Sequence, residues 1–179
     1  MPEERKQSAI SPVARITRNA VMLALLCLMG MFSIPLMENV KVSLQLFAVF
    51  VICLLSVSWW DGIIVTGCYA LIGLFLPIYA GFSSGVSPTF GYILSFLLAG
   101  PIIYFMNKIP IKISWLRMGL ACLGFLPVAY FIGTLFMMLY MGWDLGTTLL
   151  VSVVPYIPFD LAKVVLAVAV VRLLPKTVL

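Results

Sequence analysis

Long apolar stretches separated by short polar breaks run through almost the whole of this sequence. Of its 179 residues, 64% are hydrophobic and 9% are charged, whereas about a quarter of the residues in a soluble domain carry a charge. A globular core cannot hide this much apolar surface from water, and transmembrane β-strands would alternate apolar and polar residues. The unbroken stretches therefore predict an all-α, polytopic membrane protein whose spans are helices.

The polar breaks divide the chain into six predicted spans. A polar tail of residues 1–14 precedes a single transmembrane domain of residues 15–175. Pro155 and Pro158 are expected to break or bend the sixth span, and its irregular middle would then line a cavity, because non-helical backbone is tolerated at membrane depth only in protected places. The spans are residues 15–36, 43–59, 62–77, 89–107, 115–141 and 147–174. The breaks include a turn at 37–42 with Glu38, Asn39 and Lys41, a tight turn at Trp59–Gly62, a Gly/Ser loop at 78–88, and Gly142 to Asp144.

The basic residues predict how the bundle is oriented. With six spans both termini lie on one side, and that side collects nine Lys and Arg residues, against one on the other side. Since cytoplasmic loops carry the excess of Lys and Arg, both termini are predicted to be cytoplasmic, and loop 78–88 is predicted to face outward. The nine are Arg5, Lys6, Arg15, Arg18, Lys108, Lys112, Arg117, Arg172 and Lys176, and the one is Lys41.

Asp160 and Lys163 stand inside the last apolar stretch, PYIPFDLAKVVLAVAVVRLL. A charged side chain in a bilayer costs about 2.5–3.5 kcal/mol even on the mildest scale, so such residues are candidate functional sites. Residues three apart share one helix face. The two groups could therefore neutralise each other, with Asp160 also stabilising the first helical turn after Pro158, or they could share a polar ligand that carries both donors and a carbonyl or carboxylate.

Two further features offer polar groups to a ligand. Gln45 lies near the start of the second span and could meet a polar heterocycle, or bond another helix. Loop 78–88 and the helix entry that follows it combine flexible backbone at Gly85, the Ser87 hydroxyl and the aromatic rings of Tyr79 and Tyr92. An outward loop of this kind could fold over a ligand as a lid, or it could be an ordinary connector.

The sequence lacks the residues and motifs that several classes of function require. The chain has no histidine, no GxxxxGK[ST] or GxGxxG phosphate-binding pattern, and only scattered carboxylates, so neither ATP hydrolysis nor acid–base catalysis is expected. The four cysteines each lie within an apolar stretch without a CxxC pair and are expected to be buried apolar residues. No metal site and no cofactor are predicted, and the net charge of +5 is assigned to membrane topology and not to nucleic acid.

Small residues recur on the first helix. Ala20 and Ala24 are four apart, with Gly30 further on, and small residues at this spacing let two helices approach closely. The same spacing also arises by chance in most apolar helices.

Four segments together resemble the BioY family, the biotin-binding S components of energy-coupling factor (ECF) transporters. The likeness covers most of residues 15–175. Departures include Phe159 and the Phe90–Gly91 pair, where the family often has Gly and a Gly pair, and a 37–42 turn that is about one residue longer. The matching segments are IPL…VSLQ (34–36 and 42–45), LPIYAGFSSGVSPTFGY (76–92), YFIGTL (130–135) and PYIPFDLAK (155–163).

The resemblance implies a six-helix S component in a bacterial cell membrane, with an outward-facing biotin pocket. It implies a transmembrane coupling protein and two cytoplasmic ATPases as partners. Asp160 would accept from the ureido N–H groups, Lys163 would meet a ligand oxygen, and Gly85 and Tyr92 would be loop-side contacts. The Ala20/Ala24 face would pack against the coupling protein. An S component for another vitamin, a stand-alone biotin transporter and a non-transport role in the membrane are the alternatives.

Overall fold

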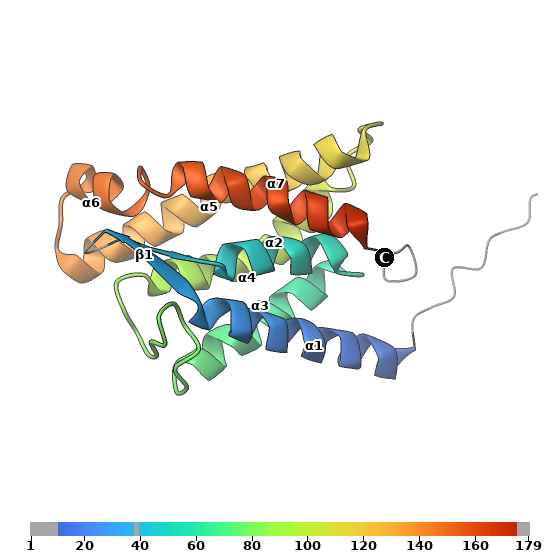
Figure 1. Cartoon of the computed structure of the whole chain (residues 1–179), viewed down its shortest axis with the longest axis horizontal. Coiled ribbons are helices and arrows are strands. Elements are labelled where there is room, and N and C mark those ends of the chain that lie inside the picture. The colour runs from blue at the N-terminus through green and yellow to red at the C-terminus, as the bar shows by residue number, and fades with distance from the viewer. Residues whose placement is uncertain (1–10, 38–39, 175–179) are drawn as a thin grey trace, which may run out of the picture.

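The computed structural model describes residues 11–37 and 40–174, with side chains left undescribed at 34–41. It is a bundle of helices with one small hairpin (Figure 1). Residues 1–10 of the predicted tail at 1–14, Glu38, Asn39 and residues 175–179 fall outside the described residues. The elements are α1 Pro12–Met31, β1 Ser33–Met37, β2 Val40–Ser43, α2 Gln45–Leu55, α3 Trp59–Gly73, α4 Phe90–Met106, α5 Ser114–Met141, α6 Leu145–Ser152 and α7 Ile157–Leu173.

Helix α2 forms the centre of the bundle. Nine of its eleven residues are buried, and it packs against α1, α3, α4 and α7. Its sequence, QLFAVFVICLL, is apolar all round, which is the pattern of a helix with neighbours on every side. Elements on all sides of α2 are thereby held at fixed positions around its first residue, Gln45.

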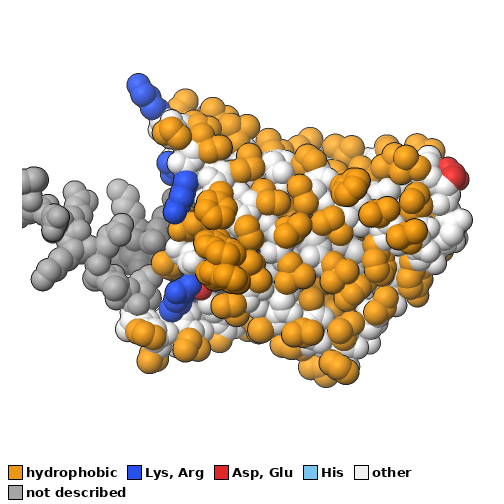
Figure 2. All heavy atoms as spheres, turned by 180° about the vertical axis from the view of Figure 1, so that it is seen from behind, with side chains coloured by type: hydrophobic (Ala, Val, Ile, Leu, Met, Phe, Trp, Pro, Cys, Tyr) orange, Lys and Arg blue, Asp and Glu red, His pale blue; other side chains and the backbone are white. Residues whose placement is uncertain are grey.

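The two ends of the bundle differ in charge. Lys and Arg side chains gather at one end, whereas the flanks are broadly apolar (Figure 2). The start of α1 and the end of α7 lie at that basic end, and the hairpin and α6 lie at the other (Figure 1). The first and last described helices thus have their outer ends at the same end of the bundle, and the placement of the termini on one side stays a prediction. Which side of the membrane they occupy stays a prediction.

The first predicted span is too long. Helix α1 begins at Pro12, with the Ser11 hydroxyl accepting from the backbone N–H of Ala14, and it ends at Met31 instead of continuing to Leu36. The next residues form the antiparallel hairpin β1–β2, with Ser33 paired to Ser43. Proline has no N–H to donate and clashes within a helix, so Pro35 prevents α1 from continuing. The hairpin also shortens the second span, which begins at Gln45.

The predicted tight turn at Trp59–Gly62 is wrong. These four residues form the first turn of α3. Ser58 and Asp61 make a capping box, in which each side chain bonds the other residue's backbone N–H, and this satisfies donors that a helix start leaves free. The indole rings of Trp59 and Trp60 stack at a centroid distance of 3.9 Å.

The sixth span is broken near its prolines, as predicted. Helices α6 and α7 meet at an angle of 45° across a short break, with Pro155 in the break and Pro158 in the first turn of α7. The start of α6 is capped by Asp144. Hydrogen bonds from the Thr147 hydroxyl and backbone N–H hold the pKa of the Asp144 carboxyl below its ordinary value.

Length and composition identify fewer clear spans than six. Among the described helices, α1 and α5 are long and apolar enough to cross a membrane, and the bent α6–α7 pair makes a third. Helices α2 and α4 are apolar but shorter; eleven residues of α2 extend about 16 Å, against a hydrocarbon thickness of about 30 Å. The fold is an all-α membrane protein, and the count of six spans stays a prediction.

Candidate ligand-binding site

A cavity of about 340 Å³ lies among α2, α4, α5, the α6–α7 break and the loop that precedes α4. Its volume falls at the lower end of the range for small-molecule sites, about 300–1,000 Å³. Of the predicted ligand-binding residues, six line it and one does not. The six are Gln45, Tyr79, Ser87, Tyr92, Asp160 and Lys163.

Asp160 and Lys163 form a buried ion pair in the cavity wall. Lys163 Nζ donates to Asp160 Oδ1 at 2.8 Å, and the residues are 7% and 5% exposed. Tyr130, from α5, donates its hydroxyl to Asp160 Oδ2, also at 2.8 Å. The two side chains therefore neutralise each other and also line a cavity that could hold a ligand. Of the three donors on the Lys163 ammonium, one is used by Asp160.

Gln45 is the first residue of α2, and hydrogen bonds from Ser43 and to Tyr69 hold its side-chain amide in the cavity wall. Its Nε2 donates to the hydroxyl of Tyr69 at 2.5 Å, and that hydroxyl donates to the carbonyl of Ile78 at 3.1 Å. Ser43 donates to Gln45 Oε1 at 3.3 Å. Since a hydroxyl has one hydrogen to give, the Tyr69–Ile78 bond fixes which end of the Gln45 amide faces Tyr69. The amide both bonds another helix and lines the cavity.

Tyr79 forms an inflexible part of the wall. Its hydroxyl donates to the Ala70 carbonyl at 2.5 Å, and its ring meets Tyr69 edge to face at 5.5 Å. The ring lies directly over Gly73, where an added Cβ would come within 2.0 Å of a ring carbon. The absence of a side chain at Gly73 is thus what lets Tyr79 reach this position.

Gly73→Ala is therefore expected to displace Tyr79 and weaken ligand binding by about tenfold or more. Overpacking a core by one methyl group typically costs about 1–3 kcal/mol, and here the displaced group is a wall of the cavity. Isothermal titration of the purified protein would measure the change in affinity. Gly119→Ala in α5 is the matched control, because a Cβ there meets nothing within 4 Å. Unchanged affinity in Gly73→Ala would contradict the role given to Tyr79.

The loop before α4 supplies only part of what was predicted. Ser87 lines the cavity, and Tyr92 lines it with its hydroxyl donating to the Ser152 carbonyl at 2.9 Å. Gly85 does not line the cavity. It adopts a φ of +76°, which suits glycine, and its N–H donates to the carbonyl of Gly73 at 2.9 Å. Gly85 thus anchors the loop to the end of α3, and its predicted ligand contact stays a prediction.

Tyr130 is the cavity residue that the sequence reasoning missed. It was noted only as the first residue of the YFIGTL segment. A signal was available, since a tyrosine near the middle of a long apolar helix needs a partner for its hydroxyl. Other lining residues, including Ser43, Thr89 and Ser152, come from segments whose meeting point depends on the hairpin and on the α6–α7 bend.

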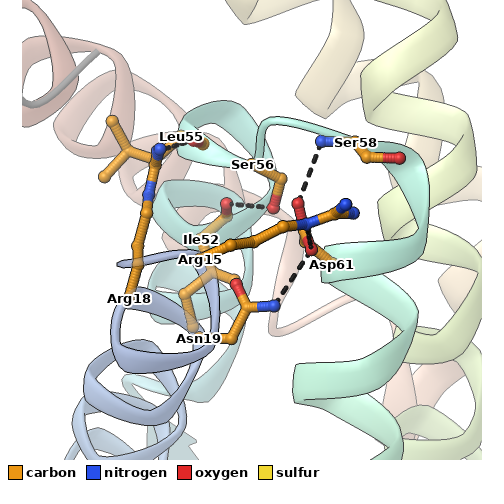
Figure 3. Close-up of polar contacts among 8 residues, drawn as sticks. All are labelled: Arg15, Arg18, Asn19, Ile52, Leu55, Ser56, Ser58 and Asp61. Atoms are coloured by element: carbon orange, nitrogen blue, oxygen red, sulfur yellow. Dashed lines mark hydrogen bonds and ion pairs between the residues drawn. The ribbon is translucent and has the colours of Figure 1, made fainter. Parts of the chain in front are cut away.

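A second buried polar cluster lies at the basic end (Figure 3). Asp61 is 1% exposed and accepts from Arg15 Nε at 2.7 Å, Asn19 Nδ2 at 2.9 Å and the backbone N–H of Ser58 at 3.0 Å. Arg18 donates to the carbonyl of Leu55. The sequence reasoning used Arg15 and Arg18 only as topology signals. In the structure they tie α1 to the turn between α2 and α3.

Ala20 and Ala24 are exposed on the outer face of α1. Gly30 is on another face and is buried, where an added Cβ would clash with the hydroxyl of Tyr69 and the carbonyl of Ile78. The three small residues therefore do not form one surface. Ala20 and Ala24 remain available to a partner, and Gly30 serves packing inside the chain.

Known proteins match this chain over most of its length. The BioY family matches residues 3–179. A protein from Thermotoga maritima named biotin transporter BioY is 30% identical over 168 residues, which cover 90% of this chain and 96% of that protein. A crystal structure of the S-component for biotin from an ECF-type ABC transporter superposes with a TM-score of 0.78 at 25% identity, covering 89% of each chain. This chain belongs to the BioY family.

Proposed function

We propose that this chain is the biotin-binding S component of an ECF-type vitamin importer in the bacterial cell membrane. The observation that carries the proposal is the buried Asp160–Lys163 pair with Tyr130 bonded to it, all three lining a cavity of about 340 Å³. The family match and the likeness to an S-component for biotin support it. The chain is a transport subunit and not an enzyme, and no cofactor is needed to bind the vitamin.

The cavity offers groups that complement biotin, which has a polar ureido ring, an apolar bicycle and a carboxylate. Asp160 would accept from a ureido N–H, and the donors of Lys163 that Asp160 leaves free would meet the ureido carbonyl. Tyr92 and Phe96 line the cavity with apolar surface for the bicycle. The hydroxyls of the loop before α4 would face the carboxylate, and Ser83, Ser87 and Thr89 all line the cavity.

The partners would be a transmembrane coupling protein and two cytoplasmic ATPases, which would supply the ATP hydrolysis that this chain lacks motifs for. The exposed Ala20 and Ala24 on α1 would pack against the coupling protein, since small residues permit close helix approach. The cavity lies toward the hairpin end of the bundle, where Ser43, Gln45 and Ser152 line it, and away from the basic end. On the positive-inside rule that end faces outward, so biotin would be captured from outside.

Purified in detergent without partners, the chain should bind biotin tightly. We expect labelled biotin to be displaced by unlabelled biotin and not by equal concentrations of thiamine, riboflavin or pantothenate, because those molecules lack the ureido ring. Equilibrium competition binding measures this, and mass spectrometry of the purified protein should find biotin as a co-purifying molecule. Preference for another vitamin would make the chain an S component of different specificity.

A further inference from the structure

The carboxylate of Asp160 is held from two different helices. Lys163, one turn further along α7, donates to Oδ1, and Tyr130 on α5 donates to Oδ2, each at 2.8 Å. Helices α5 and α7 pack against each other, and all three side chains line the cavity. The two contacts therefore reach the carboxylate from separate walls of the site.

These two partners cannot do the same work. Lys163 shares a helix with Asp160 and neutralises its charge, but it moves with that helix and bonds one oxygen only. The terminal torsion of an aspartate is broad, so a bond to one oxygen leaves the carboxylate plane free to turn. Tyr130 brings a stiff ring with two side-chain torsions from a different helix, α5. Its bond to the second oxygen fixes the plane relative to the cavity.

A fixed plane matters because Asp160 still has acceptor capacity for a ligand. An ionised carboxylate offers about four acceptor positions, and the two bonds described here occupy two of them. A ligand N–H that meets an already oriented oxygen avoids the cost of ordering that group on binding. Charge-assisted hydrogen bonds are also roughly twice as strong as neutral ones, so their geometry weighs heavily on affinity.

We propose that Tyr130 is a positioning residue of the ligand site, which acts by holding the Asp160 carboxylate in the orientation that accepts from a ligand N–H. This inference rests on the proposed biotin-binding function. A residue that acts through Asp160 must lose its effect when Asp160 is absent. A residue that contacts the ligand itself, or that only packs, would keep its effect.

A double-mutant cycle on the purified full chain separates these roles. Tyr130→Phe keeps the ring and removes the hydroxyl, and it is expected to weaken biotin binding by about tenfold. In the Asp160→Ala background the same change should alter affinity by less than about twofold. Tyr140→Phe, on the same helix but 51% exposed and not lining the cavity, is the control and should leave affinity unchanged. Asp160→Leu, which also removes both acceptor oxygens, replaces Asp160→Ala if that variant does not fold.

The cycle has distinct outcomes. An equal loss in both backgrounds would show that Tyr130 does not act through Asp160, and an unaffected Tyr130→Phe would also overturn the inference. Because Tyr130→Phe keeps the ring packing, its thermal unfolding midpoint should change much less than its affinity, and a parallel collapse of both would indicate a structural role only. If the wild-type chain fails to bind biotin at all, the proposed function fails first and this inference falls with it.

Discussion

Replacing Asp160 and Lys163 together by leucine and methionine is expected to abolish biotin binding while leaving the protein as stable as the wild type or more so. A buried ion pair is costly to desolvate, and apolar residues of similar volume often replace it without loss of stability. The pair is buried and self-neutralising, so stability gives no reason for a membrane helix to keep it. Thermal unfolding and equilibrium biotin binding of the same preparation would measure both quantities.

The single variants should behave differently from the double variant. Asp160→Ala leaves the Lys163 ammonium buried without its counter-ion, and breaking a buried pair in this way typically costs about 3–5 kcal/mol of stability. The affinity for biotin should fall as well, by about tenfold or more, because a ligand N–H loses a charged acceptor. Asp144→Asn is the charge control, because this exposed carboxylate caps α6 outside the cavity and asparagine is an equally good cap. Wild-type affinity in the double variant would show that the pair serves structure alone.

Asp61→Ala is expected to lower the free energy of unfolding by about 2–3 kcal/mol while leaving the biotin affinity of the folded protein within about twofold. The carboxylate is 1% exposed, and its loss leaves the Asn19 amide and the Ser58 N–H without their acceptor. It also removes the capping box of α3. The affinity should be spared because α2, about 15 Å long between Gln45 and Leu55, separates this cluster from the cavity.

Arg15→Ala is the comparison for Asp61→Ala. The Arg15 side chain is 41% exposed, so its half of the ion pair is partly solvated and its removal should cost no more than about 1 kcal/mol. Urea or thermal unfolding in detergent would show which of the two variants loses more stability. Equal destabilisation by both would mean that the ion pair itself, and not the buried carboxylate with its cap, stabilises this end of the bundle.

Local chemistry made much of this fold predictable. The glycine past the end of α5 and the prolines in the last span mark helix boundaries through effects at single positions. Glycine permits a positive φ, and proline fixes φ and lacks the N–H that a helix needs. Gly142 indeed ends α5 at a φ of +67°, and the span around Pro155 and Pro158 is bent. Two charged residues in an apolar helix can likewise be recognised as a candidate site without knowing which residues surround them. In the structure Asp160 and Lys163 both line the cavity.

Features that depend on distant segments were not predictable in this way. The Arg15–Asp61 pair joins residues 46 positions apart, and the local sequence around either residue does not indicate its partner. The Tyr130–Asp160 bond spans 30 positions. The capping box at Ser58 and Asp61 is a local signal of a helix start, although the two tryptophans beside it also suit an interfacial turn. The hairpin is not predictable from its own residues, because 33–36 continue the apolar stretch of the first span and 37–42 suit a simple turn.

The charges in the cavity wall cancel one another before any ligand arrives. Among the described residues that line the cavity, Asp160 and Lys163 are the charged ones, and they lie in direct contact. These walls therefore carry no net charge, and long-range attraction has little part in the selection of an incoming molecule. Recognition at this depth has to come from shape and from matching donors to acceptors at close range, which favours one heterocycle over others of equal charge.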